Sequence, residues 1–270
     1  ESSGGRRPTL LKINPHGGYV VGINLDVIET SIGLLDLEGN LKNLMKIPTE
    51  IEKKDSKEVL ENIAIAVKKL IEDFHAETGF KERISGIGIS VAGEVDHKTG
   101  MLIESANLRW RNVSIAPFIK KSTGLETFIE DIPKAMAIGE HWFGNAKDTD
   151  NLAWIYIGGG LGIGVVINGS VYRGVTGNPG EFCHVPVVRN GPLCNCGNRG
   201  CLETFVGEVP VLKRVREALK RGSTNGRSHL GYQVSLGDLS ENILAPRYHN
   251  PDVIDQISSL ADTHDLIKVA

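Results

Sequence analysis

The segment 177–203 has the sequence GNPGEFCHVPVVRNGPLCNCGNRGCLE and contains all four cysteines of the chain. The pattern H-x9-C-x-C-x4-C within it is formed by His184, Cys194, Cys196 and Cys201. One imidazole and three thiolates in one loop are enough for a tetrahedral zinc site, and the intervening glycines permit the turns that bring them together. We therefore expect a zinc knuckle over residues 184–201, with Cys183 left as a buried thiol. Four protein ligands leave no position for water, so this zinc is expected to be structural.

Strands and helices alternate on the N-terminal side of this segment. Apolar runs bounded by turn residues predict strands at 18–27, 30–40, 41–49, 84–93 and 126–131. Apolar residues at helical spacing predict helices at 56–75, 115–124, from Pro133 to Gly144, 207–220 and near 251–262. Residues 152–174 predict two further strands around a glycine-rich turn, with Asn168-Gly169 as a hairpin. The strand pattern near Gly18 thus recurs near Leu152, which favours an α/β fold of two similar lobes.

The composition excludes some classes of protein. The chain has 270 residues, and 30 basic against 33 acidic side chains give a net charge of −3. This balance argues against a nucleic-acid-binding surface over the chain as a whole. The most apolar stretch, residues 152–167, is shorter than the roughly 20 residues that a membrane-spanning helix needs. The N-terminus has no apolar signal region, so we expect a cytoplasmic protein with no membrane contact.

The segment 177–203 resembles the signature of the ROK family, which comprises repressors, open reading frames and sugar kinases. Residues 86–110 look like the sugar-binding lobe of this family, and residues 160–174 look like its second phosphate loop. The family-like region extends from about Gly18 to about Gly207. The resemblance implies an actin-like (ribonuclease H-like) fold of the sugar-kinase superfamily, in which a sugar lies between two lobes.

The resemblance also implies a domain organisation. Residues 1–17 are expected to be a linker from a missing N-terminal helix-turn-helix, because they look like the junction in xylose-type and N-acetylglucosamine-type ROK repressors. Residues 18–125 would form the first α/β lobe. Residues 126–270 would form the second lobe with the zinc knuckle. The family continues with a further helix and a glycine-rich motif, so we expect either that the C-terminus is truncated or that residues 221–270 diverge from the family.

The sugar contacts implied by the resemblance are Asn107, Asp131, Glu181, His184 and Glu203. Asp131 stands where the family usually has asparagine. Carboxylates and amides suit the role because they bind several sugar hydroxyls at once. We expect His184 to bind zinc through one ring nitrogen and to orient a sugar hydroxyl through the other. The plainer alternatives are a solvated carboxylate for Glu203 and a turn residue for Asn107.

Phosphoryl transfer is not expected from this sequence. Family kinases take the sugar proton with the aspartate of an E-N-D-A-N segment, and the corresponding segment here, residues 130–134, has the sequence EDIPK with Ile132 at that position. The neighbouring Asp131 is expected to point to the opposite face of its strand. The first phosphate loop, residues 24–28, has Asp26 and Val27 in place of two glycines. The second, residues 157–164, stays rich in glycine, which equally suits a plain tight turn.

These features together predict the sugar-sensing effector domain of a ROK-type transcriptional repressor, with no catalytic residues. Its partners would be a small-molecule sugar, DNA through a helix-turn-helix not present in this chain, and a second subunit in a homodimer. One alternative is an ATP-dependent sugar kinase similar to glucokinases or N-acetylhexosamine kinases. Another is a scaffold domain that binds neither sugar nor ATP.

Overall fold

The computed structural model describes residues 12–79, 83–157, 160–175, 177, 179, 181–207 and 210–214. The helix expected near 251–262 and most of the one expected at 207–220 lie outside these residues. Contacts along the chain define two compact units, Glu1–Pro210 and Val211–Ala270. The description below concerns the first unit.

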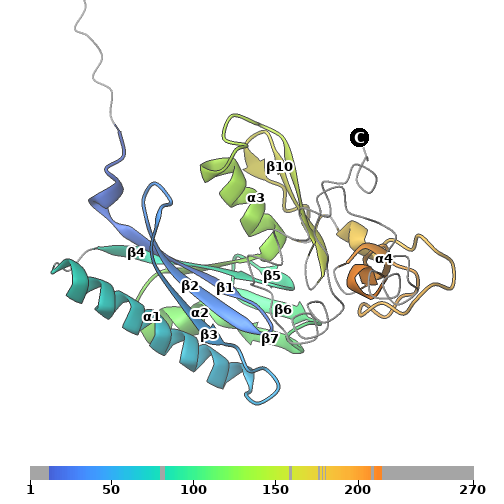
Figure 1. The fold of residues 1–270 in the computed structure, drawn as a ribbon, viewed down its shortest axis with the longest axis horizontal. Coiled ribbons are helices and arrows are strands. Elements are labelled where there is room, and N and C mark those ends of the chain that lie inside the picture. The colour runs from blue at the N-terminus through green and yellow to red at the C-terminus, as the bar shows by residue number, and fades with distance from the viewer. Residues whose placement is uncertain are drawn as a thin grey trace, which may run out of the picture. The chain divides into compact units, whose positions relative to one another are not determined.

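A five-stranded mixed sheet forms the framework of this unit (Figure 1). The strand order is β3-β2-β1-β4-β8, and the strands are β1 (Tyr19–Leu25), β2 (Glu29–Asp36), β3 (Leu41–Pro48), β4 (Ile84–Val91) and β8 (Thr127–Asp131). The first three form an antiparallel meander, whereas β4 is parallel to both β1 and β8. The alternation of buried and less buried residues along β1 is the period of two expected for a strand with one face in a core.

Two helices pack on one face of this sheet: α1 (Ser56–Thr78) and α2 (Ile115–Thr123) (Figure 1). Helix α1 begins at a capping box, in which the Asp55 side chain accepts the Glu58 N–H and the Glu58 side chain accepts the Asp55 N–H. It ends at Gly79, whose φ of 72° is the left-handed conformation that favours glycine. Its apolar stripe, including Val67 and Leu70, belongs to the same buried core as β1.

The remaining strands form two small antiparallel sheets. They are β5 (Glu94–Asp96), β6 (Met101–Ser105) and β7 (Trp110–Ser114) in one sheet, and β9 (Leu152–Ile157), β10 (Leu161–Ile167) and β11 (Ser170–Val171) in the other. Asn168 and Gly169 form the predicted hairpin between β10 and β11, with φ of 51° and 71°. Helix α3 (Ile132–Phe143) packs on β9 and β10 (Figure 1).

Strand β8 connects the five-stranded sheet to helix α3 and the small sheet of β9, β10 and β11. It is an edge strand of the five-stranded sheet and leads directly into α3, so this sheet extends beyond residue 125, the lobe border that the sequence suggested. Asp131 is the last residue of β8 and the N-cap of α3. Within the described residues, none of the helices has the length and apolar character needed to cross a membrane.

Candidate functional site

The four predicted zinc ligands lie together. One ligand atom from each of His184, Cys194, Cys196 and Cys201 lies within 4.8 Å of all the others. His184 Nδ1 is 3.6 Å from Cys194 Sγ, and Cys196 Sγ is 3.7 Å from Cys201 Sγ. A tetrahedral zinc shell with ordinary Zn–S and Zn–N bonds has ligand–ligand separations of about 3.5–3.8 Å. The donor set and its spacing therefore fit a zinc ion held by protein ligands alone.

Short turns and glycines bring these ligands together. The Cys194 N–H donates to the Asn198 carbonyl at 2.8 Å, and the Gly197 N–H donates to the Cys194 carbonyl at 2.9 Å. Gly200 has a φ of 72°, and a Cβ there would lie 1.8 Å from the Val188 carbonyl oxygen. Only glycine fits this position, which lies directly before the last cysteine ligand.

Cys183 lies beside the cluster as a buried thiol, 4% exposed. Its Sγ donates to Glu181 Oε2 at 3.8 Å. Burial, together with the negative charges of Glu181 and Glu203, raises the pKa of the Cys183 thiol to about 12. Cys183 is thus a buried thiol outside the set of His184 and three cysteines, in agreement with the expectation from the sequence.

A cavity of about 520 Å³ lies next to the cysteine cluster, and all five predicted sugar contacts line it. Asn107 comes from the turn between β6 and β7, and Asp131 from the end of β8. Glu181 and His184 lie on the short 3-10 helix η2 (Glu181–His184), and Glu203 is the first residue of α4 (Glu203–Val206). Residues far apart in the sequence are thus gathered around one space of the size that small ligands occupy.

His184 belongs to both the cysteine cluster and the cavity wall. Its Nδ1 faces Cys194, and its Nε2 lies 3.5 Å from Glu181 Oε2. A carboxylate beside the second nitrogen of a metal-ligating histidine fixes the orientation of the ring. The second nitrogen that was expected to orient a sugar hydroxyl is therefore already next to a carboxylate that lines the same cavity.

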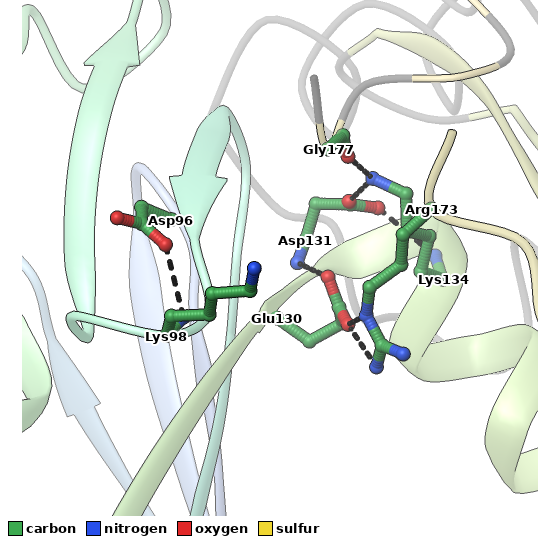
Figure 2. A network of polar contacts seen from close by, with 7 residues as sticks. All are labelled: Asp96, Lys98, Glu130, Asp131, Lys134, Arg173 and Gly177. Carbon is green, nitrogen blue, oxygen red and sulfur yellow. Dashed lines mark hydrogen bonds and ion pairs between the residues drawn. The ribbon is translucent and has the colours of Figure 1, made fainter. Parts of the chain in front are cut away.

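Asp131 is held by Lys134, a residue that the sequence analysis did not single out (Figure 2). The Lys134 N–H donates to Asp131 Oδ1 at 3.0 Å, and the Lys134 ammonium forms an ion pair with Asp131 Oδ2. Lys134 Nζ also donates to the Gly177 carbonyl at 2.8 Å. Burial raises the pKa of the Asp131 carboxyl, and the charge and hydrogen bonds of Lys134 oppose this rise.

A second ion pair lies on the other side of the same strand end (Figure 2). Arg173 Nε and a terminal guanidinium nitrogen donate to Glu130 Oε2 at 2.9 and 2.7 Å. Glu130 and Arg173 line a separate cavity, whereas Asp131 lines the cavity with the predicted sugar contacts. Asp131 thus faces the predicted sugar contacts. The expectation that it points away from residue 132 on an extended strand was wrong, because Ile132 is the first residue of α3 and lines the same cavity as Asp131.

The two turns that resemble phosphate loops both have a backbone N–H that is already bonded to a carboxylate of the chain. Asp26 Oδ1 accepts the Val27 N–H at 2.7 Å in the turn between β1 and β2. Glu203 Oε2 accepts the Leu161 N–H at 3.0 Å at the end of the glycine-rich turn. Asp26, Leu161 and Glu203 all line the cavity that holds the predicted sugar contacts.

Comparison with known proteins identifies the family. The model of the ROK family matches residues 20–238, which is most of the chain. The chain belongs to the ROK family. The fold of its solved members is the actin-like fold expected from the sequence, and the mixed α/β architecture agrees with it.

Both repressors and kinases are among its relatives. The xylose repressor of Bacillus spizizenii is 34% identical over 99% of this chain and 71% of its own length. The glucokinase of Thermotoga maritima is 31% identical over 75% of this chain and 61% of its own length.

Two solved structures have equal overall similarity to the chain. A ROK family transcriptional regulator, a homologue of the E. coli MLC protein, superimposes with a TM-score of 0.69 and 28% identity over 92% of this chain. A ROK family glucokinase from Streptomyces griseus, solved with glucose and AMPPNP, gives a TM-score of 0.69 and 26% identity over 90% of this chain. The chain spans only 60% of the length of that regulator. Family membership is therefore shown, while the choice between sensing and phosphoryl transfer depends on the site.

Proposed function

We propose that the chain is the sugar-sensing effector domain of a ROK-type transcriptional repressor and that it does not transfer phosphoryl groups. Sugar binding is supported by the cavity, since amide, carboxylate and imidazole side chains line it together. The repressor role is supported by xylose repressors that match almost the whole chain. The observation that carries the loss of phosphoryl transfer is the bond between Asp26 and the Val27 N–H.

This bond occupies a backbone N–H that a phosphate loop would offer to phosphate. Such a loop binds phosphate through free backbone N–H groups. Here the Asp26 carboxylate accepts the Val27 N–H and adds a negative charge that repels a polyphosphate. The Thr49 hydroxyl donates to the Asp26 carbonyl at 2.7 Å, which fixes the turn in this conformation. The Leu161 N–H of the second turn is bonded to Glu203 in the same way.

The position of the family's catalytic aspartate also offers no suitable base. Ile132, at the position of the family's aspartate, is 2% exposed and cannot accept a proton. Asp131 faces the cavity, but its carboxylate already accepts the Lys134 backbone N–H and forms an ion pair with the Lys134 ammonium. Asp131 is therefore suited to accept hydrogen bonds from sugar hydroxyls rather than a proton.

The proposed zinc holds the sugar contacts in place. His184 would be one of its ligands, and Glu203 follows the last cysteine ligand by two residues. DNA would be bound through a helix-turn-helix outside this chain, and two subunits would form a homodimer. The two lobes would exchange between a more open and a more closed arrangement. Sugar binding would shift this equilibrium toward the arrangement that binds the sugar more tightly, and the size of the shift would equal the difference in binding free energy.

Calorimetry of the zinc-loaded protein tests this function. We expect one of xylose, glucose or N-acetylglucosamine to bind, and the Asp131→Asn and Glu181→Gln variants to bind it more weakly. Absence of binding by all three sugars and by the other pentoses and hexoses would contradict the sensing role. A sugar kinase is the second candidate, because glucokinases also match most of the chain. Release of ADP decides between the two functions.

A further inference from the structure

The three cysteines of the predicted zinc site differ in their exposure to solvent. Cys194 and Cys201 are buried, 4% and 0% exposed, whereas Cys196 is exposed and also lines the cavity with the predicted sugar contacts. Oxidation of a cysteine requires thiolate character and access for the oxidant. Ligation to zinc keeps a cysteine as the thiolate. Cys196 meets both requirements and is the ligand that a dissolved oxidant reaches most easily.

Cys201 is the cysteine that faces Cys196. Their Sγ atoms are 3.7 Å apart, and a disulfide requires about 2 Å. The sulfur of Cys194 instead lies 3.6 Å from His184 Nδ1 and donates to Glu203 Oε1 at 3.5 Å. Cys201 is therefore the partner with which an oxidised Cys196 forms a disulfide.

The loop between these two cysteines can close the gap from the exposed side. The Cys201 carbonyl accepts both the N–H and the hydroxyl of Thr204, at 3.0 and 2.7 Å. Gly200 is packed so closely that a Cβ there would lie 1.8 Å from a backbone oxygen. Gly197, in contrast, has open space around it, because a Cβ there would meet no atom within 4 Å. Closure therefore requires movement of Cys196 and Gly197, while Cys201 stays in place.

We propose that Cys196 is an oxidation site, at which a peroxide converts the cluster to a Cys196–Cys201 disulfide, releases the zinc and lowers the affinity of the cavity for sugar. The Cys196 thiolate attacks the peroxide, so that the O–O bond breaks, a sulfenic acid forms and hydroxide leaves. The Cys201 thiolate then attacks the sulfenic sulfur, forms the S–S bond and displaces a second hydroxide. The two thiolates supply the two electrons that, with two protons, reduce one peroxide to two waters.

The disulfide leaves the metal ion with two of its four ligands, His184 and Cys194. A structural zinc site requires four protein ligands, so the ion dissociates. His184 then loses the bond that fixes its ring in the cavity wall, and Glu203, two residues after Cys201, loses the support of the cluster. This consequence rests on the proposed sensing function and deepens it by naming a regulation of the same site, whereas the oxidation itself does not depend on the sugar.

Two measurements on the zinc-loaded protein test the oxidation site directly. Hydrogen peroxide is added in the presence of a chromogenic zinc chelator, and we expect release of about one zinc per chain. Peptide mapping by mass spectrometry, with and without reduction, should identify the Cys196–Cys201 disulfide. Dithiothreitol followed by added zinc should restore the zinc content, because thiol–disulfide exchange reverses the bond.

Two variants identify the reacting cysteine. Cys183→Ser removes the buried thiol beside the cluster and should release zinc at the rate of the wild type. Cys196→His retains four zinc ligands, as two thiolates and two imidazoles, and should release zinc at least about tenfold more slowly, because position 196 no longer carries a thiolate. If Cys196→His binds no zinc, the disulfide map of the wild type decides.

Three results would overturn the oxidation site. They are retention of zinc in peroxide, a disulfide that includes Cys183 or Cys194 in place of the proposed pair, and equal rates of release from the wild type and zinc-loaded Cys196→His. Conversion of Cys196 to a sulfinic or sulfonic acid without a disulfide would also contradict the proposed step.

Calorimetry with the sugar that binds the untreated protein tests the regulation. The oxidised protein should bind it at least about tenfold more weakly, the effect of losing one hydrogen bond to a charged group, and reduction with added zinc should restore the affinity. Unchanged affinity after zinc release would overturn the regulation. Absence of sugar binding before any oxidation would instead contradict the proposed sensing function, and the oxidation site would still be decided by zinc release and the disulfide map.

Discussion

Glu203 Oε2 accepts the backbone N–H of Leu161 at 3.0 Å, and this bond connects Glu203, two residues after Cys201, to the glycine-rich turn before β10. The two residues are 42 positions apart in the sequence. A Cβ on Gly160 would lie 3.3 Å from the same carboxylate oxygen, so a side chain there would crowd the bond. Glu203 thus joins the proposed zinc site, the cavity and the turn through one carboxylate.

Glu203→Gln should weaken sugar binding more than it weakens the fold. Glutamine keeps an oxygen for the Leu161 N–H but loses the charge that strengthens hydrogen bonds to sugar hydroxyls. Hydrogen bonds to charged groups contribute about 1.5–3 kcal/mol, so we expect a decrease in affinity of about tenfold or more. Calorimetry with the sugar that binds measures this. Glu126→Gln is the matched control, and an equal decrease in both variants would contradict a role of Glu203 in the site.

Zinc removal should destabilise the protein and weaken sugar binding. Metal analysis of the wild type should find one zinc per chain, and Cys196→Ser should lose it. Structural zinc contributes to the free energy of folding, so we expect a loss of at least about 3 kcal/mol. This corresponds to a Tm decrease of roughly 6–12 °C.

Cys183→Ser is the control for this experiment. Cys183 lies outside the set of His184 and three cysteines, although it is close enough to Glu181 and His184 to form another group of metal-ligand atoms. We expect the variant to retain its zinc. Loss of zinc from Cys183→Ser, with retention in Cys196→Ser, would show that the ion is bound by the other group.

Asp36 should stabilise the fold at neutral pH and lose this effect in acid. The ion pair with Lys42 at 2.9 Å, supported by hydrogen bonds from Asn40 and Glu38, holds the pKa of the Asp36 carboxyl far below its ordinary value. A carboxyl with a lowered pKa in the folded state stabilises above its unfolded pKa of about 4, and the stabilisation is lost as the pH falls below that.

Urea unfolding of Asp36→Asn at pH 7, 5, 4 and 3 checks this pH dependence. The variant should unfold at lower urea than the wild type at pH 7, and the difference should shrink below about pH 4. Each comparison is made at one pH, so any release of metal in acid affects both proteins. Asp73→Asn, on the exposed side of α1, should show no such trend. A difference that stays constant down to pH 3 would contradict the role of the Asp36 charge.

Gly164→Ala should destabilise the packing of β10 on α3. A Cβ at Gly164 would lie 2.1 Å from the Pro133 carbonyl oxygen and 2.7 Å from Ala137 Cβ, so helix and strand would have to separate. Overpacking of this kind costs about 1–3 kcal/mol. Gly88→Ala is the control, because a Cβ there meets no atom within 4 Å. Similar unfolding midpoints in urea for both variants would contradict the close contact.

Local features of this fold were predictable from the sequence, and long-range contacts were not. The cysteine spacing indicated the ligand cluster, and the capping residues and apolar period indicated α1, because both signals lie within short segments. The pairing of β8 with β4 was not predicted, since parallel strands distant in the sequence carry no local mark of their partner. Lys134 was missed because a lysine in the first turn of a helix ordinarily lies in solvent.

Release of ADP from Mg-ATP tests the central claim most directly. The zinc-loaded protein is incubated with Mg-ATP and the sugar that binds in calorimetry, and ADP is measured against a sample without sugar, with a known hexokinase as positive control. The proposed loss of phosphoryl transfer predicts no ADP above that background. ADP formation that depends on the sugar would contradict it and would make Asp131 the first residue to substitute.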